Sequence, residues 1–168
     1  MEVVAAEQVN APVLVEKVFH EISGLSRNEI RDLIREAQAE IERYPQIEVP
    51  IKHHFSKDVY AREMILPKGA LIVGKIHKFE NLNILSKGEV SVLSIDGVMR
   101  LKAPATFVGS VGAKRVIYAH SEVVWTTIHG TSETDVRKIE EQFIAKSYDE
   151  IKEDNLIDLK QEDTKCLG

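Results

Sequence analysis

Basic and imidazole side chains gather in the middle of this sequence. Residues 51–130 carry eleven Lys and Arg against six Asp and Glu, whereas both flanking segments are acidic. Five of the six histidines lie in the same segment, namely His53, His54, His77, His120 and His129. Lys and Arg bind anions, and neutral His is a common metal ligand. The pattern therefore points to a local site for a small anion or a metal ion, unless the lysines are only solvated on the outer faces of strands.

The composition limits the classes of protein to which this chain can belong. Its 168 residues fit one domain, and 43% hydrophobic with 29% charged residues is a globular composition. The net charge of −5 argues against a protein that wraps nucleic acid. Cys166 is the only cysteine, so neither an internal disulfide nor a thiolate zinc site can form within one chain. No window approaches the run of about 20 apolar residues that spans a membrane, so we expect a cytoplasmic protein without membrane contact.

Two segments are predicted to be amphipathic helices that pack on the outer surface of a β domain. Ser26 and Glu29 form a capping-box pattern, and apolar residues then recur at helical spacing until Pro45 ends the pattern. A second capping pattern, Ser132 with Asp135, precedes a later apolar stripe. The stripe consists of Val136, Ile139, Phe143 and Ile144.

Short segments rich in Val, Ile, Thr and Tyr fill residues 49–129 and are separated by turn residues. This pattern of short strands and turns is typical of a β-sandwich or β-barrel. The clearest hairpin joins residues 89–95 to residues 98–101 through Asp96 and Gly97. We therefore predict an N-terminal arm and amphipathic helix over residues 1–48. A mainly-β barrel or jelly roll follows over residues 49–130, and a C-terminal helix with a mobile tail completes residues 131–168.

One set of spacings carries a resemblance to a known family. The five positions of the first cupin motif are matched without a gap by Gly69, Lys75, His77, Asn81 and Gly88. The second motif is matched more weakly, with Gly112 at its inner glycine and Arg115 at its histidine. Residues 50–130 thus resemble the cupin superfamily, and residues 53–125 also look like small cupin-like proteins encoded by tailed bacteriophages. The resemblance implies a cupin-like β-barrel or jelly roll that forms a homo-oligomer, a dimer or higher.

The four positions that bind metal in cupins hold poor ligands in this chain. They are occupied by Lys75, His77, Asn81 and Arg115. A lysine ammonium about 4 Å from a divalent ion would repel it by roughly 8 kcal/mol at an effective dielectric constant near 20. Only His77 remains as a strong ligand, so we expect neither a metal nor another cofactor. The alternative is a rearranged site that uses His53, His54, His120 or His129, although adjacent residues such as His53 and His54 face opposite sides of a strand.

Alternation along the strands predicts which side chains face the interior. If Lys75 and His77 point inward, then Leu71 and Val73 do too, and Ile72, Gly74 and Ile76 point outward. Trp125, Thr127 and His129 share one face of a later strand. Arg62 and Arg115 each lie among strand-forming residues, where a guanidinium must reach solvent, an anion, or a carboxylate such as Glu63, Glu80 or Glu122.

We arrive at one preferred function and two alternatives. The preferred hypothesis is a non-enzymatic protein, of phage origin if the second resemblance holds, that binds a small nucleotide-like or sugar-phosphate anion in the barrel. Its ligand-binding residues would be Arg62, Lys75, His77, Arg115, Trp125 and His129. The first alternative is a structural or interaction protein of a phage particle, which would place it in the virion rather than the host cytoplasm. The second is a metal-dependent cupin enzyme such as a dioxygenase, isomerase or epimerase.

Overall fold

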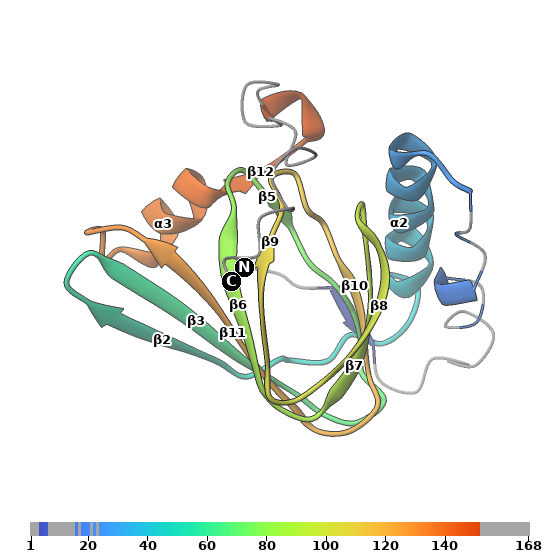
Figure 1. Ribbon diagram of the computed structural model, residues 1–168, viewed down its shortest axis with the longest axis horizontal. Coiled ribbons are helices and arrows are strands. Elements are labelled where there is room, and N and C mark those ends of the chain that lie inside the picture. The colour runs from blue at the N-terminus through green and yellow to red at the C-terminus, as the bar shows by residue number, and fades with distance from the viewer. Residues whose placement is uncertain (1–3, 7–15, 17, 21, 23, 152–168) are drawn as a thin grey trace, which may run out of the picture.

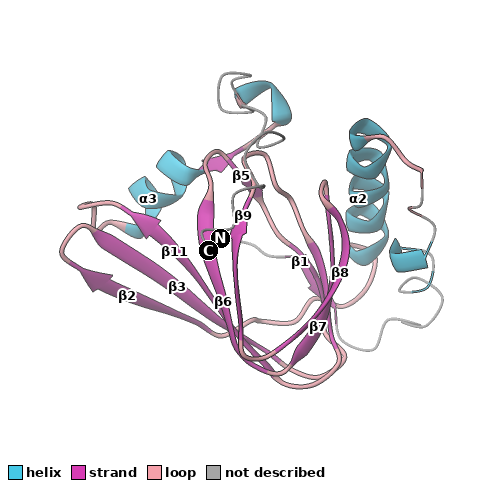
Figure 2. Cartoon of the chain, viewed as in Figure 1, coloured by secondary structure: helices cyan, strands magenta, loops and turns pink. Residues whose placement is uncertain are grey.

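Two five-stranded antiparallel sheets face each other and diverge toward one open end (Figure 1). The computed structural model describes residues 4–6, 16, 18–20, 22 and 24–151. The first sheet has the order β1 (Val4–Ala6), β4 (Leu71–Val73), β10 (Val116–Ala119), β7 (Glu89–Ser94) and β8 (Gly97–Lys102). The second has the order β2 (Ile51–Ser56), β3 (Val59–Leu66), β11 (Val123–Gly130), β6 (Asn81–Lys87) and β9 (Ala105–Gly109). A short pair, β5 (Ile76–His77) with β12 (Ile144–Ala145), lies at the open end (Figure 2).

The main core fills the space between the two sheets. Met64, Leu85 and Trp125 of the second sheet belong to the same buried cluster as Ile72 and Ile117 of the first. Strands such as β7 and β11 contribute alternate side chains to this layer, because successive residues of a strand face opposite sides. The prediction of a mainly-β jelly roll is confirmed. Of the two predicted forms, barrel and jelly roll, the structure shows the open one, since the two sheets share no strand pairing within the described residues.

Helix α2 (Arg27–Ile41) begins where the capping pattern predicts. The Ser26 hydroxyl accepts a hydrogen bond from the Glu29 N–H at 3.3 Å, and the Glu29 carboxylate accepts one from the Ser26 N–H at 2.7 Å. The buried side chains of the helix are Ile30, Ile34, Ala37 and Ile41. They share a core cluster with Leu71, Val73, Leu93 and Val116, which lie on the outer face of the first sheet. This packing fixes α2 on that face.

The predicted orientation along residues 71–77 is wrong for β4. Leu71 and Val73 pack outward against α2, whereas Ile72 belongs to the core between the sheets. The strand ends at Val73, and β5 begins only at Ile76, so Gly74 and Lys75 interrupt the alternation. An interruption of this kind changes which face later residues occupy. Lys75 and His77 therefore reach the interior even though Leu71 and Val73 do not.

Helix α3 (Val136–Phe143) differs from prediction in its start and its location. Asp135 rather than Ser132 caps it, because the Asp135 carboxylate accepts from the Arg137 N–H at 2.9 Å. The helix does not pack on an outer sheet face. It lies across the open end of the sheets, where β12 follows it and pairs with β5 (Figure 1). The 3₁₀ turn η1 (Tyr148–Glu150) then ends the described chain, and the C-terminal tail predicted to be mobile lies outside the described residues.

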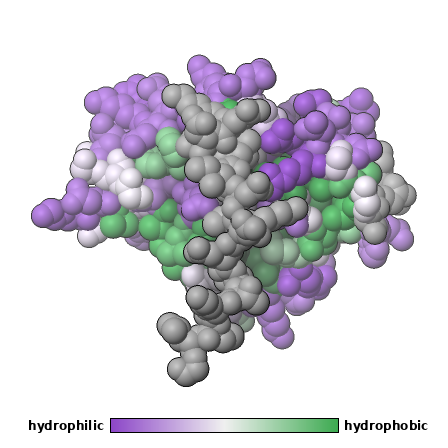
Figure 3. Space-filling view, turned by 45° about the horizontal axis from the view of Figure 1, so that its top comes forward, coloured by the Kyte–Doolittle hydropathy of each residue, from purple (hydrophilic) through white to green (hydrophobic). Residues whose placement is uncertain are grey.

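The β7–β8 hairpin is confirmed, with its turn one residue earlier than predicted. Ser94 pairs with Gly97, so Ile95 and Asp96 form the loop. Gly97 has a φ of 110°, a conformation that favours glycine. Among the described residues, no helix combines the length and apolar character needed to cross a membrane. Hydrophilic side chains gather along the upper rim of the molecule, above hydrophobic ones (Figure 3).

Candidate functional site

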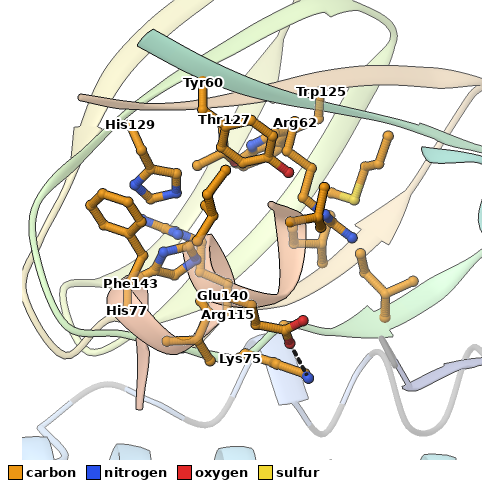
Figure 4. A pocket seen from close by; sticks show the side chains of 17 residues that line it. Tyr60, Arg62, Lys75, His77, Arg115, Trp125, Thr127, His129, Glu140 and Phe143 are labelled. Carbon is orange, nitrogen blue, oxygen red and sulfur yellow. Dashed lines mark hydrogen bonds and ion pairs between the residues drawn. The ribbon is translucent and has the colours of Figure 1, made fainter. Parts of the chain in front are cut away.

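A cavity of about 70 Å³ lies between the open ends of the two sheets, beneath α3 (Figure 4). Its walls come from β3, β4, β5, β10 and β11 and from the inner face of α3. The six side chains predicted to bind a ligand all line it, namely Arg62, Lys75, His77, Arg115, Trp125 and His129. They come from four separate stretches of chain, so only the fold brings them together.

Two arginines supply permanent positive charge to the cavity. Burial lowers the pKa of Arg115 to about 10, which leaves the guanidinium protonated at neutral pH. Burial also lowers the pKa of Arg62, opposed by the charges of Tyr60 and Glu140. The Nε and Nη2 atoms of Arg62 are buried and have no hydrogen-bond partner within the described residues. Buried donors without partners are rare in proteins, so this guanidinium is equipped to bind an acceptor.

Glycine at position 109 makes room for Arg115. A Cβ built on Gly109 would overlap the Nη2 atom of Arg115 and approach Asn81 Oδ1 within 2.8 Å. The guanidinium therefore lies against the β9 backbone, beside the buried Asn81, and its carbon also faces the Phe107 ring at 5.9 Å. The carboxylates considered as arginine partners are used elsewhere, with Glu63 paired to Lys52 and Glu122 paired to Lys87.

Two neutral imidazoles stack on the side of the cavity below α3. The rings of His77 and His129 lie 5.7 Å apart, and His129 stacks on Phe143 at 4.4 Å. Burial lowers the pKa of His77 to about 3, helped by the charge of Arg115, and burial with Arg62 lowers that of His129 to about 4. Both are therefore uncharged at neutral pH. Their Nδ1 atoms are buried without a partner among the described residues, so each can still donate or accept one hydrogen bond.

Trp125 contributes an apolar wall rather than a free polar group. Its indole N–H donates to Asn83 Oδ1 at 3.1 Å, and the Thr127 hydroxyl donates to the same oxygen at 3.1 Å. Asn83 in turn donates to Asn81 Oδ1 at 2.7 Å. The Trp125 ring meets Phe107 edge to face and is only 2% exposed. This buried network holds the wall rigid and satisfies its polar atoms.

An ion pair lies at the edge of the cavity. Lys75 Nζ lies 2.6 Å from Glu140 Oε1 of α3, and the two side chains are 33% and 23% exposed (Figure 4). Phe143 and Ile139 of the same helix form a buried cluster with Tyr60 of β3. The helix thus supplies both an apolar roof and one carboxylate to a cavity that also contains the guanidinium groups of Arg62 and Arg115.

The cavity residues do not fit the metal centre that the cupin pattern would imply. Lys75 is bound to Glu140, Asn81 accepts from Asn83, and Arg115 is a cation. No group of three metal-ligating side chains occurs among the described residues. The other histidines do not rebuild one: His54 is exposed near Glu63, His120 bonds to Ser91, and His53 shares a 2.7 Å hydrogen bond with Tyr60. Only His129 joins His77.

The comparisons with known proteins concern the fold. No protein-family model matches the sequence, and no curated protein matches it. The structure is similar to ectoine synthase from P. lautus, with 10% identity, a TM-score of 0.46, and coverage of 55% of this chain and 70% of that one. It is also similar to a conserved protein with a double-stranded β-helix domain from Klebsiella pneumoniae. The identity is 13%, the TM-score is 0.45, and the match covers 52% of this chain and 75% of that one. A third neighbour is a cupin 2 conserved barrel domain protein from Salinispora arenicola. The identity is 9%, the TM-score is 0.41, and the match covers 48% of this chain and 73% of that one. The fold and cavity together define a jelly-roll protein with a cationic interior site.

Sequence reasoning did not identify four residues that shape the site: Tyr60, Asn83, Glu140 and Phe143. A signal for Glu140 is present in the sequence. Val136, Ile139, Glu140 and Phe143 follow the i, i+3, i+4, i+7 pattern of one helix face. A carboxylate on an otherwise apolar face indicates a buried ionic partner.

Proposed function

We propose that this chain is a non-enzymatic, cupin-like binding protein whose cavity holds a small anionic ligand. The observation that carries the proposal is the Arg62 guanidinium, which lines the cavity with two buried nitrogens that lack hydrogen-bond partners among the described residues. A carboxylate or phosphate oxygen would satisfy both donors in a charge-assisted pair. Arg115 adds a second charge, and the neutral His77 and His129 add one Nδ1 hydrogen bond each.

The cavity size limits the ligand. A volume of about 70 Å³ holds on the order of five water molecules. A carboxylate or phosphate group with a short apolar portion fits this space against Ile72, Ile117 and Trp125. A nucleotide or sugar phosphate would place only its anionic group inside, with the remainder beyond Lys75.

Binding is preferred over catalysis because the reactive groups of the cavity are already used. The Glu140 carboxylate is tied to Lys75, and the Thr127 hydroxyl donates to Asn83. Among the described residues that line the cavity, the two imidazoles therefore meet no free side-chain nucleophile that they could activate.

The proposal is tested by titrating the protein with a panel of small carboxylates, inorganic phosphate, sugar phosphates and nucleoside monophosphates, using calorimetry. We expect at least one anion to bind the wild type. Arg62→Met should weaken that binding by about 10- to 150-fold, the equivalent of 1.5–3 kcal/mol for one lost charged hydrogen-bond partner. Arg100→Met is the matched control, since Arg100 of β8 pairs with Glu89 of β7 and does not line the cavity. Absence of binding by every anion, or equal loss in both variants, would overturn the proposal.

A further inference from the structure

A second, larger space adjoins the cavity on the other side of the Lys75–Glu140 ion pair. This cleft has a volume of about 580 Å³ and is bordered by α2, β4, β5, α3 and β12. Gly74, Lys75, Glu140 and Ile144 line both the cleft and the cavity. Those four residues therefore form the partition between the two spaces.

The cleft is positively charged. Lys114, Arg137 and Lys146 line it together with Lys75, against the two carboxylates of Glu140 and Glu141. A concave surface with an excess of one charge raises the local concentration of the opposite ion. A small anion is thus attracted to the cleft before it meets the partition.

We propose that the Lys75–Glu140 ion pair is the gate between the cleft and the cavity, and that an anionic ligand enters by replacing the Glu140 carboxylate at Lys75. This inference rests on the proposed function and names the route and the residue that control it. In the closed state, Glu140 is a built-in competitor that holds the place of the ligand's anionic group. Lys75 is thus paired with the Glu140 carboxylate before binding and with the ligand's carboxylate or phosphate after binding.

The structure indicates that the side chain moves rather than the helix. The carboxyl end of α3 is held by the β12–β5 pairing and by a 2.8 Å hydrogen bond from the Lys78 N–H to the Phe143 carbonyl. Phe143 also stacks on His129. Glu140 is partly exposed, and Arg137 lies three residues earlier on the same helix and lines the cleft. Arg137 is paired with Asp135 at 3.7 Å and is exposed, so it can also approach Glu140. A change of rotamer is therefore sufficient to open the gate.

Trp125 provides a direct measure of entry. It is the only tryptophan of the chain, it lines the cavity and it is 2% exposed. Iodide is a small anion that quenches tryptophan fluorescence on contact, and caesium is a cation that does the same. Quenching of Trp125 by each ion therefore reports whether small ions of that charge reach the cavity.

The experiment compares iodide and caesium quenching in the wild type, Glu140→Gln and Glu141→Gln. Glu141→Gln is the matched control, because Glu141 lines the cleft but not the cavity. We expect Glu140→Gln to raise the iodide quenching constant several-fold without a comparable rise for caesium, and Glu141→Gln to leave both unchanged. Glu140→Asp keeps the negative charge but shortens the side chain by one methylene group. Its iodide quenching constant should lie between those of the wild type and Glu140→Gln. An unchanged iodide constant in Glu140→Gln, or equal increases for both ions, overturns the gate.

The outcome for the gate can be separated from that for the proposed function. Glu140→Gln should also bind the anions of the calorimetric panel more tightly than the wild type, because an internal competitor has been removed. If the wild type binds an anion but the variant gains neither affinity nor iodide quenching, the gate is wrong and the function stands. If iodide quenching rises but no anion of the panel binds either protein, the gate stands and the proposed function fails.

Discussion

Arg62→Met is expected to stabilise the ligand-free protein. Two guanidinium nitrogens of Arg62 are buried without hydrogen bonds in the described structure. Each buried, unsatisfied donor costs about 1–3 kcal/mol. Part of this cost is offset, because the charge of Glu140 favours the protonated guanidinium and the side chain is not fully enclosed. Met has a similar length and no polar hydrogen, so we expect a net gain of about 1 kcal/mol, which corresponds to a rise of about 2–4 °C in Tm for a chain of this size.

The measurement is thermal unfolding followed by Trp125 fluorescence, in buffer without small anions and again with a saturating anion. In the absence of anion, Arg62→Met should unfold at a higher temperature than the wild type. With anion present, the order should reverse, because the wild type binds the anion more tightly and gains more stabilisation from it than the variant does. Arg100→Met should lose no more than about 1 kcal/mol in either buffer, as expected for an exposed ion pair. A lower Tm for ligand-free Arg62→Met would refute the reasoning and identify Arg62 as a structural residue.

Three further predictions concern the site and its supports. Gly109→Ala should displace the Arg115 guanidinium and weaken anion binding about tenfold or more, whereas Gly130→Ala, with open space around its Cβ, should bind normally in the same calorimetric titration. Since the pKa of His77 is about 3 when folded and near 6.5 when unfolded, the unfolded state binds more protons between these values. The free energy of unfolding should therefore decrease as the pH is lowered from 7 to 5, by up to about 1.4 kcal/mol per pH unit, as measured by urea titrations at the two pH values. His77→Gln should remove this contribution to the pH dependence. Ser26→Ala should lower the free energy of unfolding by about 1 kcal/mol while Ser26→Asn leaves it nearly unchanged, and equal midpoints for all three proteins would show that the hydroxyl is dispensable.

The charges of the cavity differ from those that a cupin metal-binding pattern would place there. At positions where the pattern expects metal ligands, this chain has Lys75 and Arg115, and the fold adds Arg62 opposite them. Cations in these places would repel a divalent metal ion, and their positive charge can be balanced by a carboxylate. Glu140 balances part of this charge from within the chain through its ion pair with Lys75.

The local features of this protein were determined by its sequence alone. The capping box at Ser26 and Glu29 starts α2 through hydrogen bonds between residues three apart. The mainly-β character of residues 49–130 followed from strand-forming residues and turn signals. The two-residue period placed Trp125 and His129 on one face of β11, whereas the tertiary structure decided that this face points into the cavity. Each of these predictions depends on interactions over a few residues.

The placement of α3, by contrast, was decided by the tertiary structure. Its amphipathic pattern is compatible with either an outer sheet face or the open end of the sheets. The choice depends on contacts between distant segments, such as Phe143 with His129 and β12 with β5. The same contacts bring Glu140 to Lys75, which lies 65 residues away in the chain. The break after Val73 likewise reversed the predicted orientation of β4, because the apolar surface of α2 buries Leu71 and Val73 from outside. Such long-range burial outweighs local periodicity, since the free energy gained by covering two apolar side chains is several times that of any local preference.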